Sequence, residues 1–227
     1  PTLQQYAEYC YAKGEDREWL SKRFEETYGI SFKDFMLLDT PNLLSDTDLT
    51  VRNYRYAKHF LYNDSLGGWF DYAVKEQYSN EFIEKAEALS KVPANEFSYL
   101  FKASEMLCRA LALKSTLSLE IRNAYENNDK VLLKEIATSR IPATIAAVDQ
   151  YIKAAREEWY IDNKTFGFDV IEIRLGGLKE RLNSTKLRLE SFVNGEIDKI
   201  EQLEEPLLEA SPQRDTWANM VTGCVNK

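Results

Sequence analysis

Residues 142–163 read PATIAAVDQYIKAAREEWYIDN. Pro142 suits the first turn of a helix, where a missing N–H costs no hydrogen bond. The apolar side chains that follow recur every three or four residues, which places them on one face of an α-helix. The stretch therefore predicts a helix from about Pro142 to Asn163. The members of its apolar stripe are Ile145, Val148, Ile152, Ala155 and Trp159.

The same spacing continues on both sides of this stretch. Upstream it predicts one helix of about 30 residues, roughly 45 Å long, which Pro93 and Asn95 start and residues 127–129 stop. Asp129 is placed to cap a short helix over residues 130–139. Downstream it predicts one long amphipathic helix that ends at Pro206. The upstream stripe is Leu100, Ala103, Leu107, Ala110, Leu111, Leu117, Ile121 and Ala124, and the downstream stripe is Ile171, Leu175, Leu178, Leu182, Leu189, Phe192, Ile197, Ile200 and Leu203.

The first 92 residues are less regular. They predict short helices over residues 2–13, 16–28, 31–38, 66–77 and 80–92, with a polar loop over 41–54. No stretch alternates apolar and polar residues over six positions, so we expect no substantial sheet. The predicted fold class is all-α. It is one domain, in which a cap of short helices (1–92) precedes a bundle of three long helices (93–206) and a tail (207–227) that Trp217 holds in place.

Composition excludes several classes of protein. The 227 residues carry 29 basic and 37 acidic side chains, a net charge of −8, whereas nucleic-acid binders present basic surfaces. No apolar run is long enough to span a membrane. Cys10, Cys108 and Cys224 lie far apart, which favours a reducing, cytoplasmic compartment. The chain starts at Pro1 without a signal segment. We therefore expect a piece of a longer polypeptide, with neither nucleic acid nor membrane as a partner.

Few residues suggest chemistry. The one histidine, His59, could serve as a base, but a structural or surface role fits it better. Gly67-Gly68 and Gly176-Gly177 lack the strand that a phosphate-binding loop requires. Neighbouring carboxylates such as Glu157-Glu158 and Glu204-Glu205 point about 100° apart on a helix and do not share a site. The sequence predicts no catalytic residue, no metal and no cofactor, and an independent enzyme centred on His59 is the weakest alternative.

The segment from Trp159 to Leu178 differs from ordinary bundle sequence. Its turn is expected to expose Asn163, Lys164, Phe166 and Phe168, and Asp169 suits the N-cap of the next helix. Gly176-Gly177 then falls inside that helix, where each glycine costs about 1 kcal/mol relative to alanine. A cost of that size indicates close packing there, either by another helix of the bundle or by a neighbouring domain or subunit.

This segment resembles the pattern Trp-x-x-x-Asn-Lys-x-Phe-Gly-Phe-x-Val-x-x-x-Arg-Leu-Gly-Gly-Leu of the C-terminal helical domain of bacterial family 20 glycoside hydrolases. These enzymes are exo-β-N-acetylhexosaminidases of the streptococcal and paenibacillal type. The similarity continues through residues 1–4, 34–39, 60–71 and 195–205, and so covers essentially the whole chain. Thr165 departs from an expected proline, and Lys179-Glu180 also departs from the pattern.

The resemblance implies a non-catalytic domain whose parent removes terminal N-acetylhexosamine by substrate-assisted hydrolysis. The acidic pair of such enzymes lies in a His-x-Gly-x-Asp-Glu motif on a (β/α)₈ barrel, and that motif is absent from this sequence. The implied partners are the catalytic barrel of the same parent chain and a second subunit in a homodimer. A stand-alone helical adaptor remains the alternative. The candidate interface or substrate-mouth residues are Trp159, Asn163, Lys164, Phe166, Phe168, Asp169, Arg174, Gly176 and Gly177.

Overall fold

A computed structural model describes residues 2–11, 16–47 and 56–207 of the chain. Within these ranges every regular element is helical and no strand occurs, which confirms the all-α prediction. The elements are α1 (Thr2–Tyr11), α2 (Arg17–Tyr28), α3 (Phe32–Phe35), the 3-10 helix η1 (Met36–Asn42), α4 (Tyr56–Tyr62), the 3-10 helix η2 (Asp71–Ala73), α5 (Tyr78–Ser90), α6 (Ser98–Lys114), α7 (Leu117–Glu126), α8 (Lys130–Glu135), the π-helical turn η3 (Ile136–Arg140), α9 (Ile141–Asp162), α10 (Phe168–Asn194) and α11 (Glu201–Glu204).

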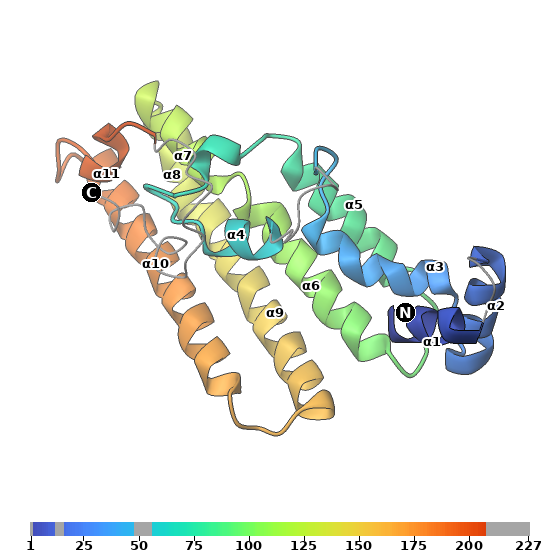
Figure 1. Ribbon diagram of the computed structural model, residues 1–227. Coiled ribbons are helices and arrows are strands. Elements are labelled where there is room, and N and C mark those ends of the chain that lie inside the picture. The colour runs from blue at the N-terminus through green and yellow to red at the C-terminus, as the bar shows by residue number, and fades with distance from the viewer. Residues whose placement is uncertain (1, 12–15, 48–55, 208–227) are drawn as a thin grey trace.

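The long helices lie side by side in the order α10, α9, α6 and α5 (Figure 1). The centre of this layer is α6, which packs against α5 on one side and α9 on the other. The short helix α4 and the 3-10 helix η1 cross α6 on one face. At the end of the molecule far from α10, α1 and α2 pack beyond α3 (Figure 1).

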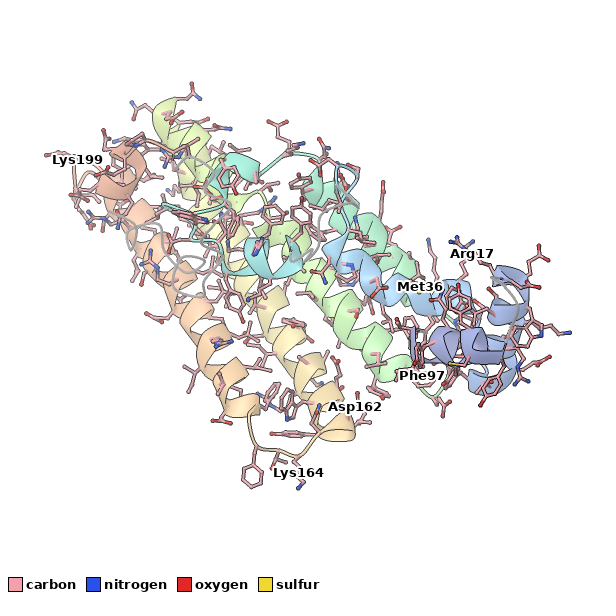
Figure 2. The ribbon with its side chains drawn as sticks, in the orientation of Figure 1. Arg17, Met36, Phe97, Asp162, Lys164 and Lys199 are labelled. Atoms are coloured by element: carbon pink, nitrogen blue, oxygen red, sulfur yellow. The ribbon has the colours of Figure 1, made fainter. Side chains whose placement is uncertain are left out.

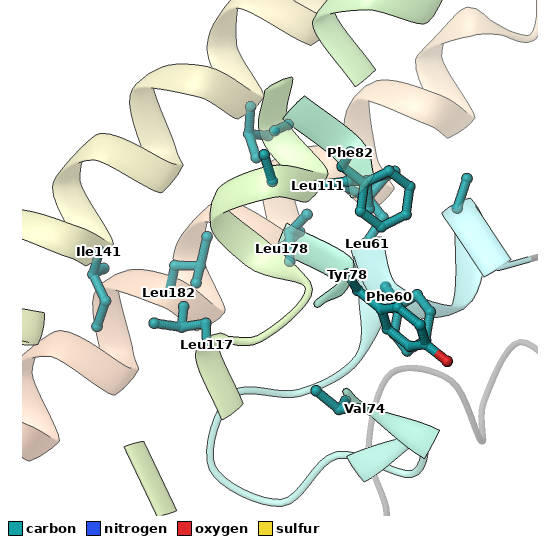
Figure 3. Close-up of a cluster of buried hydrophobic side chains, with 14 of the residues drawn as sticks. Phe60, Leu61, Val74, Tyr78, Phe82, Leu111, Leu117, Ile141, Leu178 and Leu182 are labelled. Carbon is teal, nitrogen blue, oxygen red and sulfur yellow. The ribbon is translucent and has the colours of Figure 1, made fainter. Parts of the chain in front are cut away.

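One hydrophobic core joins the short helices to the long ones. It runs from Phe24 in α2 to Leu203 in α11 without interruption. Figure 3 shows part of it, where Phe60 of α4 and Tyr78 of α5 pack with their ring centroids 5.3 Å apart. Leu111 of α6 is fully buried in the same cluster. The N-terminal helices and the bundle therefore share their buried surface.

The predicted helix of about 30 residues after Pro93 is wrong, because the structure has α6 and α7 with a break at Ser115 and Thr116. Leu111 and Leu117 on either side of the break are both fully buried. Six residues along a straight helix turn a side chain by about 240°, so an unbroken helix could not bury both on one side. The bend lets the two leucines reach the same core.

The predicted downstream helix that ends at Pro206 is α10, and it is also shorter than predicted. It ends at Asn194, because Gly195 adopts a left-handed conformation with φ 77° and donates its N–H to the Phe192 carbonyl at 3.2 Å. The N–H of Glu196 then donates to the Ser191 carbonyl at 2.9 Å, as in a Schellman-type helix end. The buried residues beyond Gly195 belong to the separate helix α11 and the segment before it.

This C-terminal segment is fastened to α7. The buried guanidinium of Arg122 donates through Nη1 to the carbonyls of Leu203, at 3.0 Å, and Glu205, at 3.2 Å. The hydroxyl of Tyr125 accepts the N–H of Ile200 at 3.2 Å. These hydrogen bonds pair backbone groups that lie beyond the end of α10. The tail from residue 208, including Trp217 and Cys224, lies outside the described residues.

Two shorter predictions also need correction. Residues 66–77 form turns and only the short η2, because side chains rather than a helix take up the backbone N–H groups of Gly68 and Phe70. The helix predicted over 31–38 divides into α3 and η1, and η1 extends to Asn42, into the predicted loop. The part of that loop over residues 48–54 is outside the described ranges.

The predicted helix at 142–163 is α9, displaced by one residue. Asp129 caps α8 as expected, accepting the N–H of Leu132 at 2.9 Å. No loop separates α8 from α9, since the π-helical turn η3 joins them. Among the described residues, no helix has both the length and the apolar composition to cross a membrane.

Candidate functional site

The turn between α9 and α10 is built around Trp159. Its indole Nε1 donates to the carbonyl of Lys164 at 2.7 Å. Gly167, with φ 97°, lies against the indole, and a Cβ at this position would be 3.3 Å from Trp159 Cζ2. The N–H of Gly167 donates to Asp169 Oδ1 at 2.9 Å. Glycine is required here both by the left-handed backbone and by the adjoining ring.

The structure divides the predicted turn residues into two groups. Phe168 is only 1% exposed and packs on Trp159 with ring centroids 5.9 Å apart, so the prediction that both phenylalanines are exposed is wrong. Phe166 is 84% exposed. Asn163, Lys164 and Asp169 also face solvent, and Figure 2 labels Lys164 at the tip.

Asp169 is not the N-cap of α10. Gly167 occupies that position and supplies no side-chain cap. Asp169 lies in the first turn, where its carboxylate faces the N–H of Gly167 instead. The charge still lies at the positive end of the helix, and it stabilises the turn rather than the first helical N–H groups.

Ion pairs and hydrogen bonds brace the hairpin. Arg156 Nη2 donates to Glu172 Oε1 at 2.7 Å, and the same guanidinium lies over the ring of Phe168, 5.7 Å from its centroid. At the tip, the hydroxyl of Tyr99 in α6 donates to Asp162 Oδ1 at 2.7 Å. These contacts hold the two helices in one arrangement. The outward face of α10 is consequently presented on a fixed support.

The glycine pair Gly176-Gly177 lies on that outward face. A Cβ on either residue would meet nothing within 4 Å among the described residues. Close packing by another described helix therefore does not account for the pair. Contact with a neighbouring domain or subunit, the other cause considered for the pair, stays a prediction. Ile173, one turn earlier, is 73% exposed.

A pocket of about 270 Å³ opens beside Gly177, between α10 and the segment that follows α4. Leu178 and Leu182, both buried, lie in its wall. Arg174 and Arg181 border it from the same helix. The remaining lining residues are Tyr62, Asn63, Asp64, Ser65 and Ile173. Most of the surface exposed in the pocket is apolar, and two guanidinium groups lie beside it.

The segment lining the other side of the pocket is held by Asn63. The side chain of Asn63 donates to Asp71 Oδ1 at 2.7 Å and accepts the N–H of Phe70 at 2.9 Å. Asp71 Oδ2 accepts the N–H of Gly68 at 3.1 Å. Only glycine fits at position 68, because a Cβ there would lie 2.3 Å from Asn63 Oδ1. The wall of the pocket is therefore held in place by hydrogen bonds within its own segment.

Buried charges surround this segment. Lys114 is fully enclosed and donates through Nζ to the Asn63 carbonyl at 2.5 Å. Burial lowers the pKa of Lys114 to about 8, although Asp64 and Asp71 favour the charged form. Burial also raises the pKa of the Asp71 carboxyl. On the pocket side, Arg181 Nε donates to Asp64 Oδ2 at 2.8 Å.

Sequence reasoning did not identify this buried network. The available signal was a polar run, Asn63-Asp64-Ser65, followed by Gly67-Gly68 inside an otherwise apolar stretch. His59, in contrast, has its imidazole stacked on Phe70, with centroids 4.2 Å apart and planes 9° from parallel, an arrangement consistent with the structural role expected for it. In the described part of the chain no group of three or more His, Cys, Asp or Glu side chains could hold a metal ion.

One comparison with known proteins identifies the family of this chain. A family model described as the Glycoside Hydrolase 20C C-terminal domain matches residues 33–222, which confirms the resemblance noted in the sequence. A search of curated proteins finds no match to the chain. The matched residues include the pocket, the hairpin and all of the long helices, while α1 and α2 precede them. The chain belongs to the family of glycoside hydrolase 20C C-terminal domains, the accessory helical domains of glycoside hydrolases.

Proposed function

We propose that this chain is the non-catalytic companion of a hydrolase that removes terminal N-acetylhexosamine, and that it docks on the catalytic (β/α)₈ barrel of the same parent chain. The docking surface is defined as the outward face of α10 with its hairpin tip: Phe166, Val170, Ile173, Gly176 and Gly177, together with the pocket beside Gly177. The observation that carries this proposal is the open space over Gly176-Gly177.

Two adjacent glycines in a helix interior cost about 1 kcal/mol each relative to alanine. Nothing among the described residues occupies the space that two alanine methyl groups would fill. The missing side chains therefore bring no packing advantage within this part of the chain. A partner could pack directly against the α10 backbone where these side chains are missing, and that contact would compensate for the cost of the two glycines.

The surroundings of the pair support a protein partner. Ile173 and Phe166 are large apolar side chains that face solvent at 73% and 84% exposure. The pocket offers space for a partner side chain, and Arg174 and Arg181 border it. Apolar anchors, a receiving pocket and arginines around them are typical of the centre of an interface.

In this proposal, glycoside hydrolysis takes place on the barrel that the helical domain contacts. In the family mechanism one carboxylic acid protonates the glycosidic oxygen while the 2-acetamido group of the sugar attacks the anomeric carbon. The acidic motif for those steps is absent from this sequence. Our proposal assigns to the helical domain the support of the barrel through the α10 docking surface.

The test compares Gly177→Leu in this chain and in the parent enzyme. In this chain we expect greater stability, by about 1 kcal/mol, since leucine is a better helix former than glycine and its Cβ would meet no described atom within 4 Å. In the parent we expect the opposite sign, with a thermal midpoint several degrees lower, because the leucine would intrude into the interface. Ala146→Leu, on the exposed face of α9, is the matched control and should be neutral in both.

Activity assays separate this proposal from the adaptor alternative. We expect an aryl N-acetylglucosaminide to be hydrolysed by the parent and not by this chain alone. Hydrolysis by this chain would contradict the non-catalytic role. Hydrolysis by neither protein would favour a stand-alone helical adaptor. An unchanged parent carrying Gly177→Leu would show that α10 is not the docking surface.

A further inference from the structure

Helix α1 has its amphipathic faces reversed relative to the rest of the domain. The residues Leu3, Tyr6, Ala7 and Cys10 follow the i, i+3, i+4, i+7 spacing of an apolar helix face, and all four are exposed. The three least exposed residues of α1 are polar. They are Gln4, Gln5 and Glu8.

The contacts of α1 with the described residues are weak. Glu8 lies 3.7 Å from the Arg23 guanidinium of α2, whose side chain is half exposed, and an ion pair at such a surface contributes about 1 kcal/mol or less. Gln4 Oε1 is buried and has no hydrogen-bond donor in the described ranges. No residue of α1 is buried. A helix of ten residues is marginal in water unless its apolar face is packed, so α1 needs a partner that these ranges do not contain.

We propose that α1 is an inter-domain helix, whose apolar face of Leu3, Tyr6, Ala7 and Cys10 packs against the catalytic barrel that precedes this domain in the parent. This inference rests on the proposed function, but it uses a second surface. Leu3 is 85% exposed and Tyr6 is 70% exposed, so most of their apolar area is available for burial. The face carries no charge, and it therefore fits an apolar surface with a hydrogen-bond acceptor for the Tyr6 hydroxyl.

The position of the family match favours the barrel as the occupant. The match begins at residue 33, after α1 and α2, and a C-terminal domain follows another part of its enzyme along the chain. The two helices differ in their attachment, since α2 buries Leu20 and Phe24 in this domain whereas α1 buries nothing. The boundary between the two domains therefore falls between α1 and α2.

The two proposed contacts are well separated. In Figure 1, α1 lies at the end of the molecule away from α10, with α5, α6 and α9 between them. The barrel would hold the helical domain at two places, and each place can be tested without the other.

Cys10 lies on the proposed face and is exposed in this chain, which makes its thiol a probe of the contact. The experiment measures the rate of iodoacetamide labelling of the Cys10 peptide by mass spectrometry, in this chain and in the parent enzyme. We expect labelling to be slower by about 100-fold in the parent, where the thiol reacts only after local opening. Equal rates in the two proteins would overturn the proposal.

A second copy of the chain is the other occupant that the assay detects. If the labelling rate of Cys10 in this chain falls as its concentration rises, the face binds another copy and the barrel assignment is overturned. A cysteine introduced by Glu18→Cys in a Cys10→Ser background is the control. Glu18 is exposed in α2, outside the apolar face of α1, so the thiol at this position should react at the same rate in this chain and in the parent.

Matched substitutions extend the test to stability. Tyr6→Asp should lower the thermal midpoint of the parent by several degrees. Tyr9→Asp, in the same helix but off the spacing of the apolar face, should not, and neither substitution should affect this chain. Equal effects of the two substitutions in the parent would contradict the assignment. If Cys10 is protected in the parent while Gly177→Leu has no effect there, the α10 surface fails and the α1 contact stands. If Gly177→Leu destabilises the parent while Cys10 stays reactive, the α1 contact fails alone.

Discussion

At Gly68 a single methyl group decides whether the wall of the pocket can form. A Cβ at this position would lie 2.3 to 2.5 Å from the side-chain atoms of Asn63, which is itself held by Phe70 and Asp71. We expect Gly68→Ala to lower the free energy of unfolding by about 1–3 kcal/mol, measured by urea denaturation. Gly67→Ala is the control, because its Cβ would make an ordinary 3.8 Å contact with Gln202. Equal stability of the two variants would refute the role of Asn63.

The buried Lys114 makes the stability of the protein depend on pH. Because burial lowers its pKa from 10.5 to about 8, the folded protein binds fewer protons than the unfolded chain between these pH values. The contribution of Lys114 to the free energy of unfolding therefore rises with pH across that window. In an NMR titration of ¹³C-labelled lysine, we expect the Lys114 Cε resonance to move with a midpoint near pH 8. A midpoint at the ordinary lysine value would contradict the burial of its charge.

The sequence predicted some of these residues only in part. It identified Trp159 and Phe168 as members of a special turn, but their inward direction depends on the left-handed Gly167 and its contact with the indole. The buried network escaped prediction, since Asp64 and Arg181 are 117 positions apart in sequence. Pairings of that kind follow from the packing of α4 against the bundle and have no local pattern.

At the scale of helices, the same substitution should have opposite effects at two glycines of one hairpin. We expect Gly167→Ala to be destabilising by about 1–2 kcal/mol, because φ is 97° and the new methyl group would press on Trp159. Gly177→Ala should be stabilising by about 1 kcal/mol, since the helix gains a better former and nothing is displaced. Thermal denaturation of the two variants checks both signs, and a shared sign would contradict this account of the hairpin.

Helix boundaries were predictable where local chemistry fixes them. Pro142 and Asn163 bracket α9 to within one residue. The end of α10 was missed because the apolar pattern continues beyond Gly195 through Ile200 and Leu203, which are buried in the same core by a different segment. Periodicity reports burial, and two elements that face one core can produce one continuous pattern.

For the whole molecule, the shared core predicts a single unfolding transition. Leu117 is fully buried in a cluster that extends from α2 to α11. We expect Leu117→Ala to cost about 2–5 kcal/mol and to lower the far- and near-ultraviolet circular dichroism midpoints together. Two separate transitions would show that the short helices and the long bundle fold independently.

The π-helical turn between α8 and α9 fixes the rotation of the hairpin about its own axis. Leu133, Ala137 and Ile141 are fully buried at steps of four residues, a spacing wider than the 3.6 residues of an α-helical turn. The π-helical turn has more residues per turn than an α-helix, so it keeps these three side chains on the same side. Deleting one residue from Ile136–Arg140 would rotate everything after it by about 100°, and the fully buried Val148 of α9 would no longer face the core. The number of residues in this one turn thus determines the direction in which the distant turn between α9 and α10 faces.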